Sequence, residues 1–184
     1  MPIVNAEQLR KLSIRLFKKM GVPHNVSQAV SNSIVENCLY GHDSHGMVLL
    51  PRFIRDIESG KIRPDAKPGI IRKSTATALI NGNRGFGQVT LREAVDTAVR
   101  IAKHTGISGV TVTNCNHVGI LWTFARRIAD KGMLGFIWCA SGGQGGLVAP
   151  YGGIRRAIGA NPIAFGIPAG KMKPLVLDIS TSAV

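Results

Sequence analysis

Residues 61–68, Lys-Ile-Arg-Pro-Asp-Ala-Lys-Pro, separate two parts of the chain that differ in hydrophobic pattern. Two prolines within this short stretch disfavour both a helix and a central strand, so we expect a loop. Before it, apolar residues recur at helical spacing, whereas after it short apolar runs alternate with helical patterns. This change predicts a mixed α/β protein with an amino-terminal helical lobe over 1–68 and an α/β lobe over 69–184.

Three helices are predicted before the loop. The first begins after Asn5, a residue suited to cap a helix, and stops at Gly21. The second covers about 25–39. The third starts in the region 44–45 and ends at Gly60. Leucine, isoleucine, valine and methionine mark one face of each, as in helices that pack on a common core.

The second part alternates strands and helices. We expect strands at 70–71, 76–80, 110–112, 133–140, 163–167 and 175–178, and helices from a cap at Thr90 to Gly106 and over 120–131. The last strand leads into polar residues that resemble the approach to another element. We therefore expect an α/β fold that is incomplete at its carboxyl end.

The composition favours a globular protein. Of its 184 residues, 45% are hydrophobic and 18% are charged, and the longest apolar run, 133–140, is too short to span a bilayer. The amino terminus lacks a secretion signal, so we expect a cytoplasmic location. The three cysteines are an odd number without a C-x-x-C pair, so they are expected to be free thiols, mostly buried.

The net charge of +13 could attract nucleic acid, acidic membranes or small anions. The basic residues occur in short pairs, without long runs and without the interleaved aromatic residues that stack on bases. This distribution argues against a dedicated nucleic-acid groove, and a basic nucleic-acid-binding module is kept as a minor alternative.

Several familiar site motifs are absent from the sequence. It contains neither G-x-G-x-x-G nor the phosphate loop G-x-x-x-x-G-K-[ST], which argues against a standard Rossmann site and against NTP hydrolysis by that route. It also lacks H-E-x-x-H and any other compact set of metal ligands. We expect no metal site.

Two histidines stand where proton transfer is plausible. His45 lies at a glycine-flanked junction between two predicted helices, where it either faces a cleft or occupies the first turn of a helix capped by Asp43 or Ser44. His117 follows a strand and precedes a helix, a common position for functional groups in α/β proteins. The alternative interpretation is that His117 is a turn residue whose ring hydrogen-bonds the backbone.

Two further segments have weaker signals for ligand binding. The glycine-rich stretch 141–146 would let backbone N–H groups approach a phosphate, and 178–182 offers three hydroxyls and a carboxylate after a strand. Each is by itself more often a plain loop or a cap.

Six motifs lie along the chain in a set order: Gly-His-Asp-Ser-His-Gly at 41–46, Asn-Gly-Asn-Arg-Gly-Phe-Gly-Gln at 81–88, Asn-Cys-Asn-His-Val-Gly at 114–119, Val-Ala-Pro-Tyr-Gly-Gly at 148–153, Gly-Ala-Asn-Pro-Ile-Ala-Phe at 159–165 and Leu-Asp-Ile-Ser-Thr-Ser at 177–182. In this order they resemble the malate/L-lactate dehydrogenase family. That family includes ureidoglycolate, sulfolactate and diketogulonate enzymes and is unrelated to the Rossmann lactate and malate dehydrogenases.

The resemblance implies hydride transfer between NAD or NADP and a 2-oxo or 2-hydroxy acid, on a non-Rossmann α/β fold and usually in a homodimer. By position, His45 and His117 correspond to two histidines with proton-transfer roles in different members. The resemblance does not decide which of them moves the proton. The segment 178–182 corresponds to a cofactor-binding segment. The implied cofactor-binding residues are Ser44, Ser141, Asn161, Pro162, Asp178, Ile179, Ser180, Thr181 and Ser182.

The sequence departs from the family pattern in two ways. Leu49 stands where many members have an arginine that can pair with a substrate carboxylate, and Phe53 replaces a tyrosine. Together with Arg52 they are assigned to the substrate pocket, and they favour a substrate with an apolar side chain. Members are also about twice as long, which leaves a non-catalytic remnant of the family as an alternative.

Overall fold

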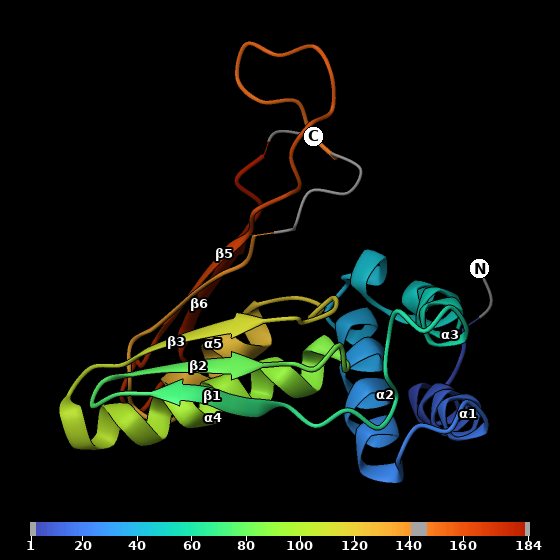
Figure 1. Ribbon diagram of the computed structural model, residues 1–184, viewed down its shortest axis with the longest axis horizontal. Coiled ribbons are helices and arrows are strands. Elements are labelled where there is room, and N and C mark those ends of the chain that lie inside the picture. Colours follow the sequence, from blue (N-terminus) through green and yellow to red (C-terminus); the bar gives the residue numbers. More distant parts are fainter. Residues whose placement is uncertain (1–2, 141–146, 183–184) are drawn as a thin grey trace. The chain divides into compact units, whose positions relative to one another are not determined.

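The computed structural model describes residues 3–140 and 147–182 and divides into two compact units, 1–119 and 120–184 (Figure 1). The fold is mixed α/β with helices first, as predicted. The boundary between the two units comes after Gly119, not after the loop 61–68. Ile62 in that loop and Phe86 beyond it pack into the same core as the amino-terminal helices and so belong to the first unit. A boundary between lobes at 68/69 stays a prediction for the complete protein.

Three α-helices open the first unit: α1 over Ala6–Lys19, α2 over His24–Leu39 and α3 over Leu50–Glu58. Asn5 caps α1 as predicted, since its side-chain oxygen accepts hydrogen bonds from two backbone N–H groups of the first turn. Apolar residues from these helices and the following loop form one core. Its fully buried members include Phe17, Val30, Ile34, Phe53 and Ile62.

The third helix begins later than predicted. Two short 3₁₀ turns, Asp43–His45 and Met47–Leu49, precede α3. Gly46 separates them because its backbone lies directly against Cys38 of α2, where a side chain would collide with the sulfur. This tertiary contact interrupts the helical pattern at the point where His45 lies.

The first unit also contains a sheet of β1 (Gly69–Lys73), β2 (Thr77–Asn81) and β3 (Gly109–Thr113) in the order β1-β2-β3. β1 is antiparallel to β2, and β2 is parallel to β3 through a crossover that contains α4 (Gly87–Thr105). Figure 1 shows α4 against one face of this sheet. The crossover brings the carboxyl ends of β2 and β3 side by side.

The predicted cap at Thr90 is wrong. α4 already begins at Gly87, and the Thr90 hydroxyl donates to the Phe86 carbonyl within the first turn. The earlier start is possible because Phe86 is extended and Gly87 has no side chain to meet the backbone of Asn116 and His117.

The second unit has one helix on one sheet. α5 (Trp122–Ala129) packs against β4 (Gly135–Trp138), β5 (Ile163–Ile167) and β6 (Leu175–Ile179), in the order β4-β5-β6 and antiparallel throughout. Gly166 permits the contact because its backbone lies against Ala125 of α5. A sheet of this topology is not a Rossmann sheet, in agreement with the predicted fold class.

The three cysteines are free thiols, but they are partly exposed rather than mostly buried. Each lies beside a loop or strand end and not in a core. Within the described part of the chain, no helix is long and apolar enough to cross a membrane.

Replacing Gly87 by alanine is expected to destabilise the first unit by about 2 kcal/mol or more, because the new methyl group would overlap the backbone of Asn116 and His117. Chemical unfolding of the two proteins measures the difference. Gly69→Ala is the matched control, since nothing lies near that added methyl, and its effect is expected to stay below about 1 kcal/mol. Equal losses in both variants would contradict this close contact.

Candidate active site

His45 and His117 lie face to face. Their ring centroids are 5.5 Å apart and the ring planes differ by 29°. His45 comes from the 3₁₀ turn after α2, and His117 comes from the loop after β3. The fold therefore joins two of the sequence-predicted residues, which lie far apart in the chain, into one imidazole pair.

The loop of His45 is fixed from α2. The Asn37 side-chain amide donates to the His45 carbonyl at 2.7 Å, and the Met47 N–H donates to Cys38 Sγ at 3.3 Å. Ser44 Oγ lies 3.0 Å from His45 Nδ1. Neither Asp43 nor Ser44 caps a helix through any of these bonds. The structure therefore lacks the predicted alternative in which one of them caps the helix that contains His45.

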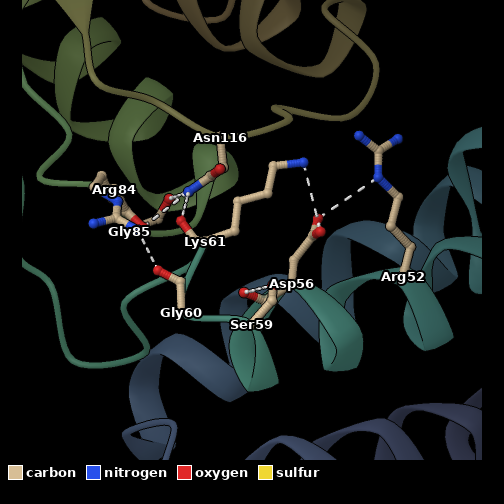
Figure 2. Close-up of polar contacts among 8 residues, drawn as sticks. All are labelled: Arg52, Asp56, Ser59, Gly60, Lys61, Arg84, Gly85 and Asn116. Carbon is tan, nitrogen blue, oxygen red and sulfur yellow. Dashed lines mark hydrogen bonds and ion pairs between the residues drawn. The ribbon is translucent and has the colours of Figure 1, made fainter. Parts of the chain in front are cut away.

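The loop of His117 is fixed by its neighbour Asn116. The Asn116 amide nitrogen lies 2.8 Å from the Arg84 carbonyl, 3.0 Å from that of Gly85 and 3.4 Å from that of Lys61 (Figure 2). Arg84 has a left-handed backbone, φ +62°, and its guanidinium donates to the Gly60 carbonyl. The Asn116 amide thus connects its own loop, next to His117, with the loops that follow α3 and β2.

His117 is held as a neutral imidazole. The Gly119 N–H donates to His117 Nδ1 at 3.2 Å, so in the neutral ring the proton is on Nε2. The pKa of His117 is lowered from 6.5 to about 4, mainly by burial; the charges of His45, Arg52 and Lys61 contribute in the same direction, and Asp56 opposes them. At neutral pH this ring can donate a hydrogen bond from Nε2.

Two buried amides border the same region. Gln88, in the first turn of α4, is 4% exposed, and neither of its amide atoms has a hydrogen-bond partner among the described residues. The same is true of Asn37 Oδ1. A Cβ atom on Gly119 would lie 3.5 Å from Asn37 Nδ2 and 3.8 Å from Gln88 Nε2. Burying a polar group without a hydrogen-bond partner costs about 1–3 kcal/mol. Unpaired amides are therefore unusual at positions that serve only the stability of the fold.

An ion network lies beside the loop of Asn116 and consists of Arg52, Asp56 and Lys61 (Figure 2). Arg52 Nε lies 3.6 Å from Asp56 Oδ2, and Lys61 Nζ lies 3.5 Å from Asp56 Oδ1. The other two predicted pocket residues are buried in the hydrophobic core. Leu49 is 9% exposed, and Phe53 is 1% exposed and packs edge-on against Phe86.

The second unit contains most of the predicted cofactor residues. Thr181 Oγ1 donates to the Asn161 carbonyl at 2.8 Å, and the Ser182 N–H contacts Ser180 Oγ at 3.3 Å. Pro162 precedes β5 and Ile179 ends β6, so both segments lie at one end of the sheet. Ser141 lies outside the described residues.

Asp178 has a structural task in this unit. Its carboxylate accepts the backbone N–H groups of Leu121 and Trp122, at 2.8 and 2.9 Å, and so caps the amino terminus of α5. Over residues 3–140 and 147–182, no group of three or more His, Cys, Asp or Glu side chains could hold a metal ion.

Sequence reasoning does not identify the residues around the histidine pair. Asn116 and Gln88 occur only within motifs, Lys61 only within the loop 61–68, and Asn37 in neither. Only the left-handed turn after β2 carries a local signal, the sequence Asn-Gly-Asn-Arg-Gly at 81–85. The contact of Lys61 with Asn116 spans 55 positions, and that of Asn37 with His45 depends on the turn between α2 and α3.

A neutral histidine paired with a second one, beside two cations and on a non-Rossmann α/β fold, defines an acid–base site suited to a small anionic molecule. The family model for malate/L-lactate dehydrogenase matches residues 4–184. The chain belongs to this family.

Three relatives illustrate the match. The chain is 38% identical over 178 residues, or 97% of its length, to a malate dehydrogenase of Pyrococcus abyssi, and 30% identical over 99% of its length to a Delta(1)-pyrroline-2-carboxylate reductase of Burkholderia ambifaria. The solved structure of sulfolactate dehydrogenase from Methanocaldococcus jannaschii matches all of the chain with a TM-score of 0.92 and 32% identity. The chain spans about half of each: 48%, 53% and 52%.

The lowered pKa of His117 predicts a defined pH dependence of stability. Above about pH 6.5 the ring is neutral in both the folded and the unfolded chain. Between pH 6.5 and about 4 the unfolded chain binds a proton that folded His117 does not, so stability falls as the pH falls through this range. Urea unfolding of wild type and His117→Gln at several pH values measures this contribution. The variant should lose less stability on acidification, and parallel curves would refute a neutral, buried His117.

Proposed function

We propose that the complete protein is a dehydrogenase that transfers a hydride between NAD or NADP and a 2-oxo or 2-hydroxy acid. The observation that carries this proposal is the imidazole pair of His45 and His117, with its neutral member, in a chain of the malate/L-lactate dehydrogenase family. The bound nicotinamide would supply or accept the hydride at the substrate carbon.

The histidine pair suits the proton half of this reaction. Hydride addition to a ketone leaves negative charge on the oxygen, which a nearby imidazole can stabilise by a hydrogen bond and neutralise with a proton. Because His117 is neutral with its proton on Nε2, it is suited to donate a hydrogen bond to that oxygen. His45 is then the candidate for proton transfer.

The described part of the second unit offers a polar set that suits a nicotinamide dinucleotide. Ser180 and Thr181 have exposed side chains next to Asn161 and Pro162. Their hydroxyl and backbone groups are of the kind that bind carboxamide and ribose groups. We assign Asn161, Pro162, Ile179, Ser180, Thr181 and Ser182 to this role, with Asp178 orienting the segment from the end of α5 and with Ser44 and Ser141 as further candidates.

The names of the relatives support a carboxylate-bearing substrate. Malate, sulfolactate and pyrroline-2-carboxylate each have a carboxylate next to the carbon that would exchange the hydride. We retain Leu49 and Phe53 as residues that shape the apolar side of the pocket from the core, and Arg52 as its polar member. We also propose a homodimer in the cytoplasm.

A turnover assay tests the proposal. The chain is mixed with NADH or NADPH and with pyruvate, oxaloacetate, phenylpyruvate or a branched 2-oxo acid, and cofactor oxidation is followed. Turnover supports the proposal, and preference for phenylpyruvate or the branched acid supports an apolar pocket. A folded chain that neither binds nor oxidises either cofactor would favour the non-catalytic remnant. DNA binding that weakens steeply with salt would favour the nucleic-acid module.

In the active protein, His45→Ala and His117→Ala are each expected to lower kcat by about 100-fold or more, because each removes a group that acts on the reacting oxygen. His104→Ala is the matched control, since His104 is exposed in the last turn of α4. Steady-state kinetics and circular dichroism separate loss of activity from loss of fold. Near-full activity in both site variants would rule out this assignment.

A further inference from the structure

Arg52 has an unused edge on its guanidinium. It approaches Asp56 through Nε at 3.6 Å, and Figure 2 shows its two terminal nitrogens directed away from that carboxylate. The arginine side chain is 46% exposed, whereas that of Asp56 is 18% exposed. Guanidinium groups bind carboxylates most strongly through two parallel N–H groups. The outer edge of Arg52 is therefore available for such a pair.

Lys61 adds a second cation to the same cluster. Its Nζ lies 3.5 Å from the other oxygen of Asp56, and its side chain is 55% exposed. One carboxylate shared by two cations leaves the cluster with a net charge of +1. Neither contact is as short as a strong charge-assisted hydrogen bond, so both cations can shift towards a further anion.

The cluster lies beside the histidine pair. The Lys61 carbonyl accepts a hydrogen bond from Asn116, the residue before His117, and the charges of Arg52 and Lys61 act on the His117 ring. Leu49 cannot supply an anion contact, because it is apolar and belongs to the core. Arg52 and Lys61 can do so, because their side chains are about half exposed and their charges act on the His117 ring.

We propose that Arg52 and Lys61 bind the carboxylate of the 2-oxo acid, with Arg52 as the bidentate partner and Asp56 as the residue that positions both cations. This inference rests on the proposed function and adds to it the residues that select an anionic substrate. It assigns to Arg52 and Lys61 the role that residue 49 cannot fulfil in this chain.

The test uses oxamate, an unreactive analogue of a small 2-oxo acid, and the neutral diamide oxamide as its control. Each is titrated into the 184-residue chain at low salt, and the imidazole NMR signal of His117 is followed. We expect saturable binding of oxamate in the millimolar range and no effect of oxamide at the same concentrations.

Variants identify the residues that bind the anion. Arg52→Gln is expected to raise the Kd for oxamate by about tenfold or more and Lys61→Gln by less, since only the arginine offers a two-pronged contact. Arg52→Lys keeps the positive charge but loses the two parallel N–H groups, and should give an intermediate Kd. Arg72→Gln, at an exposed arginine of β1, is the matched control and should leave the Kd unchanged.

The inference is overturned if Arg52→Gln and Arg72→Gln give the same Kd, or if the wild-type chain shows no saturable oxamate binding. Because the titration needs neither cofactor nor turnover, its result is independent of the activity assay. Oxamate binding through Arg52 without any turnover would leave the carboxylate site intact and count against the dehydrogenase proposal alone.

Discussion

The amide of Asn116 is the contact on which the candidate site depends. It joins the carbonyls of Lys61, Arg84 and Gly85, and so connects the loops that follow α3, β2 and β3. Backbone hydrogen bonds connect the same loops, from the Arg63 N–H to the Arg84 carbonyl and from the Arg84 N–H to the Asn114 carbonyl, both at 2.9 Å, and the amide adds side-chain bonds to them. The arrangement holds the next residue, His117, against His45 and brings Lys61 to the same side. Backbone and side-chain hydrogen bonds together hold the three turns in one arrangement.

The positive net charge of the chain, +13, is also present locally at this site. Two cations, Arg52 and Lys61, act on the His117 ring of the pair, and Asp56 offsets part of their charge. Burial is the main cause of the lowered pKa of His117, and the positive charge around the ring acts in the same direction. The same positive charge would favour a bound anion. The neutral imidazole and the proposed anion binding thus share one contributing cause.

Several elements could be predicted from local pattern. Helical spacing, the cap at Asn5 and Gly21 after α1 were sufficient to predict the first two helices, and β5 was predicted at its observed limits. The errors at 43–49 and at the start of α4 have one cause. Gly46 lies against α2 and Gly87 lies against the His117 loop, and these distant contacts override the local pattern.

The sequence by itself determined the mixed α/β class, the order of its elements and the two histidines, because periodicity and turn residues act over a few neighbouring positions. The order of the six motifs, which indicates the family, is likewise a property of the sequence alone. Only the tertiary structure decided that His45 and His117 stack, that Leu49 and Phe53 belong to the core, and that Arg52 and Lys61 share Asp56. The histidine contact joins residues distant in sequence, whereas Asp56 lies only four and five residues from its two cations. The energies of these contacts come from burial and charge, which exist only once the chain has folded.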